Sequence, residues 1–131
     1  MPSDFLLDTN IVIQLFNRHP LVCKREQRQP LPFLPFVTAT ELLYGAKRSA
    51  RRSANVAVYQ RFLNRFQILY PDRTTLDVHS DLREALSQIG KPIPENDLWQ
   101  AALAIQHDAI LVTNDHHFDV VPGLRREDWT A

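Results

Sequence analysis

Four acidic residues stand far apart in this chain, each where a strand should give way to a helix or a helix should begin: Asp8, Glu41, Asp97 and Asp115. If the fold brings their carboxylates together, they form a pocket that offers only oxygen ligands. Such a pocket favours hard cations, Mg2+ or Mn2+, over metals that prefer nitrogen and sulfur. Divalent ions held by carboxylates support phosphoryl chemistry, so the sequence points to hydrolysis or transfer of a phosphate group.

Each of these acids also has a purely structural explanation. Asp8 could start a helix, since Asp is a common cap, and Asp97 could stabilise a helix N-terminus through the macrodipole. The segment from Thr38 to Glu41 matches the capping-box pattern. Asp115 could be a turn residue. Taken singly, these explanations are the commoner ones, and only the combination of four acids at the ends of elements favours a site.

The elements that must position these acids are visible as alternating apolar runs and helical patterns. Buried strands are expected at residues 5–7, near 36–37, at 67–70 and at 109–113, and helices are expected after residue 9, before Pro30, and over 38–44, 56–66, 74–89 and 98–105. This alternation predicts an α/β fold whose central parallel sheet carries helices on both faces. Ligands bind beyond the carboxyl ends of such strands, where Asp8 and Asp115 are expected.

The aromatic residues of the two middle helices are expected to pack in the core. They are Tyr44, Tyr59, Phe62 and Phe66, and the last three recur at helical spacing. An aromatic stripe of this kind serves packing more often than ligand binding.

Length and composition set limits on the class of protein. A chain of 131 residues with 44% hydrophobic residues is expected to form a single domain over residues 1–131. The lone Cys23 cannot close an intrachain disulfide, and no apolar run is long enough to span a bilayer, so we expect a cytoplasmic protein with no membrane partner. The three glycines are not spaced to cradle a phosphate, which excludes P-loop and dinucleotide-binding sites.

The zero net charge hides an asymmetry along the chain. Residues 1–70 carry ten Lys or Arg against four Asp or Glu, whereas residues 71–131 carry five against eleven. Basic residues that follow Glu41 are candidates for contacting a phosphate backbone: Lys47, Arg48, Arg51 and Arg52. A solvated helix face is the commoner explanation of such a run.

Four segments of the chain carry a resemblance to a known family. They are Leu6-Leu7-Asp8-Thr9-Asn10, then Thr40-Glu41-Leu42-Leu43-Tyr44-Gly45-Ala46, then residues 90–98 (Gly-Lys-Pro-Ile-Pro-Glu-Asn-Asp-Leu), and finally Leu111-Val112-Thr113-Asn114-Asp115 with Val121-Pro122-Gly123-Leu124. In this order and spacing they resemble the PIN-domain family, most closely the VapC toxins of toxin–antitoxin pairs. The resemblance covers nearly the whole chain and implies the three-layer PIN-like fold.

The resemblance also implies a function and a set of site residues. It implies a Mg2+- or Mn2+-dependent endoribonuclease, a hydrolase that leaves a 5′-phosphate and a 3′-hydroxyl, with Asp8, Glu41, Asp97 and Asp115 as catalytic and metal-binding residues. Four flanking residues would orient these ligands: Thr9, Asn10, Thr113 and Asn114. The implied partners are an RNA substrate and a VapB-like antitoxin, with a homodimer and a toxin–antitoxin hetero-oligomer as assemblies. Val120 departs from the family, because many relatives carry Arg there.

Two other functions stay open at the level of sequence. The first is a catalytically silent PIN-like module that binds RNA or a protein partner. The second is a haloacid-dehalogenase-like phosphatase, which would need a second Asp two residues after Asp8, where this chain has Asn10. His116 and His117 beside Asp115 are expected to be exposed turn residues rather than ligands.

Overall fold

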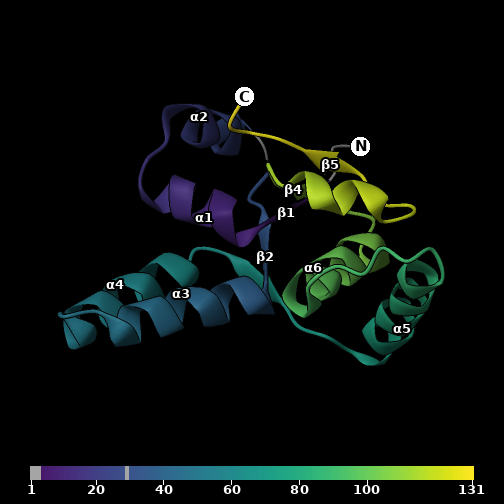
Figure 1. Cartoon of the computed structure of the whole chain (residues 1–131). Helices are drawn as coiled ribbons and strands as arrows, with labels where there is room; N and C mark the ends of the chain where they lie inside the picture. The colour runs from purple at the N-terminus through teal and green to yellow at the C-terminus, as the bar shows by residue number, and fades with distance from the viewer. Residues whose placement is uncertain (1–3, 29) are drawn as a thin grey trace.

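The computed structural model describes residues 4–28 and 30–131, and shows a sheet of short strands between two groups of helices (Figure 1). The strands are β1 (Phe5–Leu7), β2 (Phe33–Pro35), β3 (Gln67–Leu69), β4 (Ile110–Val112) and β5 (Arg126–Glu127). The helices are α1 (Thr9–Phe16), α2 (Pro20–Arg28), α3 (Phe36–Arg48), α4 (Arg52–Leu63), α5 (Arg73–Gln88) and α6 (Glu95–Gln106), with the 3-10 helix η1 (His116–Val120). In this part of the chain, no helix combines the length and the apolar character that crossing a membrane requires.

The sheet is parallel throughout, in the order β3-β2-β1-β4-β5. β1 and β4 are neighbours at its centre, with Leu7 paired to Val112. The residues that follow these two strands therefore leave the same edge of the sheet side by side. The predicted α/β architecture with a parallel sheet is confirmed.

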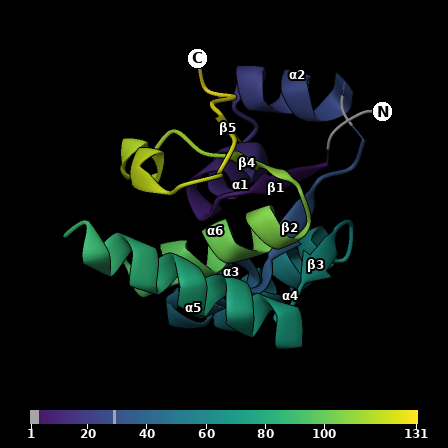
Figure 2. The same cartoon turned by 90° about the vertical axis from the view of Figure 1, so that its right-hand side faces the viewer.

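Alternate residues of the central strands serve two separate cores. Leu7 and Val112 pack with α1, α3 and α4 on one face, whereas Leu6 and Leu111 pack with α5 and α6 on the other. Figure 2 shows α5 and α6 together in front of the strands, turned a quarter from the view of Figure 1. Such burial on both faces explains why the strands read as unbroken apolar runs.

The expected boundary between the second strand and its helix was wrong. Phe36 and Val37 open α3 instead of ending β2, and Pro35 is the residue at the helix N-terminus, without a side-chain cap. Thr38 therefore lies inside the helix. The capping-box explanation of Glu41 is excluded, because Thr38 does not cap α3 and its hydroxyl lies 3.0 Å from the hydroxyl of Thr9.

The aromatic residues of the middle helices divide between core and surface. Tyr59 stacks on Phe16 at 4.5 Å between ring centroids, and Phe62 packs against Phe66 at 5.2 Å, as expected. Tyr44 does not join them, and 61% of its surface is exposed. The prediction that Tyr44 packs in the core was wrong, because this residue lies on the side of α3 that faces away from the sheet.

Candidate active site

Asp8 follows β1 directly and lies at the N-terminus of α1. Its Oδ1 accepts a 2.7 Å hydrogen bond from the backbone N–H of Thr9, so it does cap the helix. Its Oδ2 accepts a 2.8 Å hydrogen bond from the hydroxyl of Thr113, which follows the neighbouring strand β4. The adjacency of β1 and β4 thus fixes a buried carboxylate at the centre of the sheet edge.

Glu41 is carried by the exposed side of α3, one turn beyond the contact between α3 and α1. That contact is the pair of hydroxyls of Thr9 and Thr38. The Glu41 carboxylate accepts a 3.2 Å hydrogen bond from the side-chain amide of Asn96, which lies in the first turn of α6. The Glu41 carboxylate is therefore linked to α6 through Asn96. Its helix, α3, is linked to α1 through the hydroxyls of Thr38 and Thr9.

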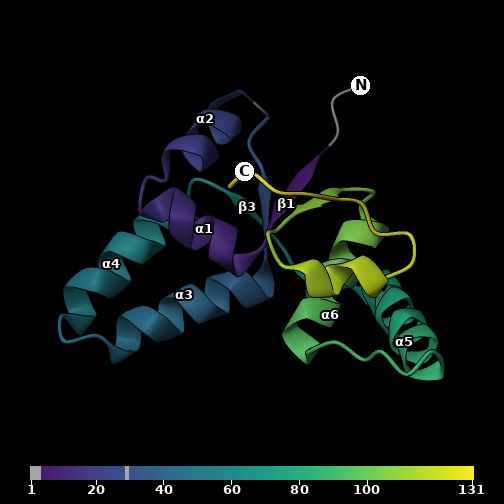
Figure 3. The same cartoon turned by 45° about the horizontal axis from the view of Figure 1, so that its top comes forward.

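Asp97 lies in the first turn of α6, as the sequence predicted, beside a helix start that Pro94 leaves without a side-chain cap. Its Oδ2 is 2.6 Å from Nε2 of His117, and its Oδ1 accepts a weak 3.5 Å hydrogen bond from Gln100. Figure 3 shows the starts of α1 and α3, the start of α6 and the η1 turn close to one another at the carboxyl edge of the sheet.

Asp115 caps η1 and completes the group. Its Oδ1 accepts a 3.1 Å hydrogen bond from the backbone N–H of His117 and lies 2.6 Å from Nδ1 of the same residue. The backbone N–H of Asp115 donates to the hydroxyl of Thr113, the same hydroxyl that donates to Asp8. Thr113 therefore ties two of the four acids together.

The electrostatics of the site reflect four like charges at one edge of the sheet. Burial raises the pKa of Glu41, and the negative charges of Asp8 and Asp97 raise it further, against hydrogen bonds that lower it. Burial is also the main cause of the raised pKa of Asp97, with Asp8 and Asp115 adding to it and His117 acting in the opposite direction. Both carboxyls are thus harder to ionise than in water, which a cation between them would reverse.

The donor set fits a hard divalent cation by its chemistry. The four acids supply carboxylate oxygens, and burial, with a smaller contribution from neighbouring carboxylates, raises the pKa of Glu41 and Asp97. As the side chains are placed, no three His, Cys, Asp or Glu residues in ranges 4–28 and 30–131 lie close enough together to hold one ion.

Two of the four flanking residues expected to orient the acids contact Asp8. Its carboxylate accepts hydrogen bonds from the backbone N–H of Thr9 and from the hydroxyl of Thr113. Asn10 and Asn114 are exposed, and within the described part of the chain neither makes a hydrogen bond to any of the four carboxylates. The basic residues at the C-terminus of α3 and the start of α4 are all exposed: Lys47, Arg48, Arg51 and Arg52.

His117 is the residue that sequence analysis missed. It was expected to be an exposed turn residue, yet its ring contacts Asp97 with one nitrogen and Asp115 with the other. His116, in contrast, is exposed as predicted, with 84% of its side chain accessible. The apolar Phe118 that follows gave the available signal, because a buried Phe118 anchors η1 and turns the preceding residue back toward α6.

The turn after Asp115 is held by an arginine from the edge strand. Arg126 in β5 contacts both carboxylate oxygens of Asp119, at 2.5 and 3.2 Å, and donates to the carbonyl of Thr113. These hydrogen bonds lower the pKa of Asp119. Val120, at the end of η1, packs against the core.

The chain is similar in sequence and in structure to known proteins. Residues 5–124 match the model of the PIN domain. The chain is 37% identical to Ribonuclease VapC2 of Haemophilus influenzae, over 95% of this chain and 97% of the relative, and 33% identical to the tRNA(fMet)-specific endonuclease VapC of Shigella flexneri, over 96% and 98%. Among solved structures, the DNA-bound VapBC of Salmonella typhimurium is similar with a TM-score of 0.89 and 29% identity, over 97% of this chain and 98% of that chain.

Proposed function

The chain belongs to the PIN-domain family and, within it, to the VapC ribonucleases, and from this premise we propose that it is the endoribonuclease toxin of a VapBC-type toxin–antitoxin pair. The observation that carries the proposal is the group of four carboxylates from separate elements at the carboxyl edge of the sheet. Divalent-metal dependence is a general property of ribonucleases of this family. Mg2+ or Mn2+ is the specific ion that we propose, because the donors are all oxygens.

Asp8, Glu41, Asp97 and Asp115 are the proposed metal ligands. The bound ion would neutralise phosphate oxygens and lower the pKa of a water molecule. Attack of this water on phosphorus would break the bond from phosphorus to the 3′ oxygen. The water would supply the new oxygen on phosphorus, one of its protons would end on the leaving 3′ oxygen, and the products would be a 5′-phosphate and a 3′-hydroxyl.

The chain's own residues hold this site in place before substrate arrives. Thr113 keeps the Asp8 carboxylate aimed at the sheet edge, and Asn96 ties Glu41 to α6. His117 orients Asp97 relative to Asp115. Hydrogen-bonding partners of ligand side chains commonly set metal affinity in this way.

We extend the proposal to the basic residues beyond Glu41. Lys47, Arg48, Arg51 and Arg52 follow the helix that carries this acid and are exposed, so their charges are available to the phosphates of RNA. Phosphate contacts of this kind position a nucleic acid without reading its sequence.

A VapB-like antitoxin and a second copy of this chain are the proposed protein partners, because the similar solved structures are toxin–antitoxin complexes of VapBC type. A cavity of about 690 Å³ between α1, α2 and α4 offers a place for an antitoxin segment. It is lined by both apolar and charged side chains, among them Phe16, Phe62 and Arg65, at the end of α1 opposite Asp8. We propose that residues 1–131 form one domain that acts in the cytoplasm, where RNA is present and the thiol of Cys23 stays reduced.

Cleavage of total cellular RNA tests the proposed activity. The protein, freed of any co-purified antitoxin, is incubated with Mg2+ or Mn2+, with a chelator, and as the Asp97→Asn variant. Cutting by the wild-type protein that is lost in the other two conditions is the expected result. If folded, metal-supplemented wild-type protein cuts no RNA yet binds it, the chain is a binding module without catalytic activity.

A further inference from the structure

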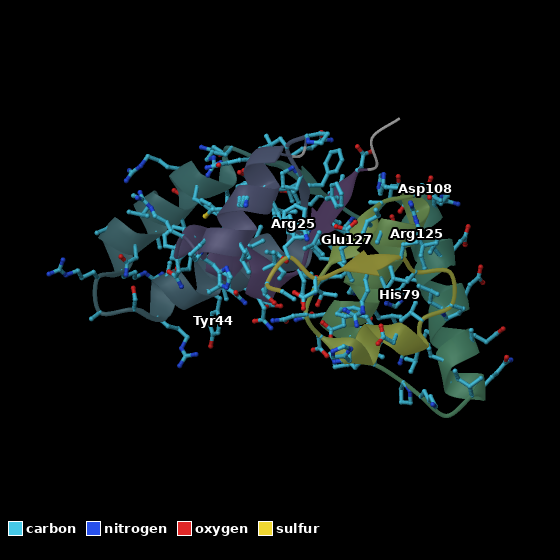
Figure 4. All side chains as sticks on the ribbon, turned by 90° about the horizontal axis from the view of Figure 1, so that it is seen from above. Arg25, Tyr44, His79, Asp108, Arg125 and Glu127 are labelled. Carbon is cyan, nitrogen blue, oxygen red and sulfur yellow. The ribbon has the colours of Figure 1, made fainter. Side chains whose placement is uncertain are left out.

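Tyr44 is the exposed aromatic residue nearest in sequence to the candidate active site. It follows Glu41 by three residues in α3, and residues three apart lie on the same side of a helix, about 4.5 Å apart along its axis. Figure 4 shows its side chain projecting away from the ribbon of α3. The ring is therefore presented to solvent beside one of the proposed metal ligands.

The guanidinium group of Arg48 lies over the exposed Tyr44 ring. The guanidinium carbon of Arg48 lies 5.4 Å from the centroid of the Tyr44 ring, within the range of a cation–π contact. Arg48 is itself one turn further along α3 and exposed. Glu41, Tyr44 and Arg48 thus form a row along one side of the helix that leads away from the carboxylates.

The surroundings of Tyr44 are polar and open. Its exposed neighbours on α3 are Thr40, Glu41, Lys47 and Arg48, and Gly45 beside it has nothing within 4 Å of the position of a Cβ atom. A protein partner that covers an aromatic residue normally adds further apolar contacts around it. A single ring among cations, with free space beside it, fits a planar and charged ligand better.

We propose that Tyr44 stacks on an unpaired base of single-stranded RNA beside the phosphate that is cleaved, while Arg48 contacts the adjoining backbone. Aromatic rings interleaved with basic side chains are the usual means of binding single-stranded nucleic acid. The inference rests on the proposed ribonuclease function and adds to it a residue that holds the substrate. The base must be unpaired to stack on the ring.

Binding of short single-stranded RNA tests this inference in the Asp97→Asn background, where cutting is not expected. One base of the oligonucleotide is replaced by fluorescent 2-aminopurine at successive positions, and both anisotropy and quenching are measured. Tyr44→Ala and Tyr44→Leu should weaken binding by roughly 5-fold to 100-fold and abolish the quenching at one position, because the stacking contact is lost. Tyr44→Phe should preserve both signals.

Tyr70 offers a matched control within the same chain. It is 65% exposed, but it follows β3, which is separated from β1 by β2 in the sheet. Tyr70→Ala should leave affinity and quenching unchanged. An oligonucleotide that lacks the stacked base should bind the Tyr44→Ala and parent proteins equally, since the interaction is absent from both.

The possible outcomes separate this inference from the proposed function. Unchanged affinity and quenching in Tyr44→Ala would overturn the inference, even if the wild-type protein cuts RNA in a metal-dependent manner. A change in Tyr44→Ala limited to gel-filtration behaviour, with RNA binding intact, would assign the residue to a protein interface and overturn it as well. Failure of the wild-type protein to cut RNA would contradict the proposed function. If Tyr44→Ala still lost affinity and quenching, base stacking on Tyr44 would stand, but its place beside a cleaved phosphate would not.

Discussion

His117 contacts two of the four carboxylates, and its ring links α6 to η1. Nε2 lies 2.6 Å from Asp97 and Nδ1 lies 2.6 Å from Asp115, while the ring stacks on Phe118 at 4.8 Å. A ring fixed at three points holds both acids at a defined separation. We therefore treat His117 as a positioning residue of the site.

Replacement of His117 by Phe should impair the site without unfolding the protein. Phe keeps the stack on Phe118 but loses both nitrogen contacts, so Asp97 and Asp115 lose their common support. Changes to residues that orient metal ligands typically cost 10-fold to 100-fold in affinity or activity, and we expect a loss of roughly this size. The measurement is the Mg2+ concentration that gives half-maximal RNA cleavage.

The neighbouring histidine provides the control for this prediction. His116 contacts Asp119 and Arg126 and is mostly exposed, so His116→Phe should leave the Mg2+ requirement unchanged. A lower Mg2+ requirement in His117→Phe would contradict the positioning role. It would mean that the ring competes with the metal for the two carboxylates.

Sequence reasoning could find the acids at this scale but not the histidine. Asp8 and Asp115 follow apolar strands whose parallel pairing puts them at one edge, so their meeting follows from the pattern. The orientation of His117 depends on a short 3-10 turn anchored by Phe118, and no periodic pattern of apolar residues predicts such a turn. The roles predicted for Asn10 and Asn114 stay predictions, since adjacency in sequence does not say where a side chain points.

The first turn of α6 connects the active site to two other helices. Asn96 donates to Glu41 of α3, Asp97 contacts His117, and the carboxylate of Glu95 lies 2.8 Å from Nε2 of His79 in α5. The His79 ring also stacks on Trp99 of α6 at 4.0 Å. Because Pro94 gives α6 no side-chain cap, these contacts replace the cap in holding the helix start.

Replacement of His79 by Phe should therefore reduce catalysis from a distance. Phe keeps the stack on Trp99 but cannot bond to Glu95, which removes a hydrogen bond worth about 1 kcal/mol of folding free energy. If the start of α6 shifts, Asp97 moves with it, and kcat should fall about 10-fold with little change in KM for RNA. Steady-state kinetics and a thermal melt measure the two effects.

His107 at the other end of α6 is the matched control. It is exposed, and His107→Phe should change neither kcat nor the melting temperature appreciably. If His79→Phe lowers stability but leaves kcat unchanged, the contact to Glu95 serves packing alone.

The sequence predicted the elements better than their boundaries. The apolar run before Thr113 identified a parallel strand because burial on both faces demands it. The end of β2 was placed too late because Phe36 and Val37 are apolar, and either a strand or the buried side of a helix accepts them. Pairing of Phe33 with Leu6 and Pro35 with Leu69, not local propensity, decides where this strand lies.

The fold mixes the basic and acidic halves of the chain at the active site. Asp8 and Glu41 come from the basic half, whereas Asp97 and Asp115 come from the acidic half. The asymmetry seen in sequence therefore does not separate a nucleic-acid side from a metal side by itself. The surface that we propose for RNA is the exposed basic end of α3 and the start of α4.

Neutralising one of these basic residues should change the salt dependence of RNA binding. If Arg51 contacts a phosphate, Arg51→Gln removes one counterion-releasing contact and lowers the slope of log affinity against log salt by about 0.7 for a single strand. The loss should be similar for RNAs of different sequence, because a phosphate carries no sequence information. Lys91→Gln, after α5, is a control for the general effect of lost charge, and an equal change in both variants would contradict a local contact.

Because the pKa values of Glu41 and Asp97 are raised, these two groups should make the metal-free protein less stable as the pH rises through the range in which they ionise. Burial and neighbouring carboxylates hold both values above those of the unfolded chain. Between the unfolded and folded pKa values the native state binds more protons, so this contribution to stability is lost as pH rises through that window and is absent at neutral pH. The pKa values of three other carboxyls are lowered, so these groups make the protein more stable as the pH rises: Asp72, Asp119 and Asp128.

Comparison with variants isolates the contribution of the site from these opposing groups. In the presence of a chelator at neutral pH, Glu41→Gln and Asp97→Asn should melt at a higher temperature than the wild-type protein, and the difference should shrink as the pH falls. Asp77→Asn, which removes a charge from the exposed side of α5, should not show this pattern. Added Mn2+ should raise the melting temperature of the wild-type protein most at neutral pH, where the carboxylates are free of protons, and have little effect on either variant. A wild-type protein that melts above both variants in the chelator would show that ionised Glu41 and Asp97 do not destabilise the folded chain, and would remove the electrostatic argument for a metal beside them.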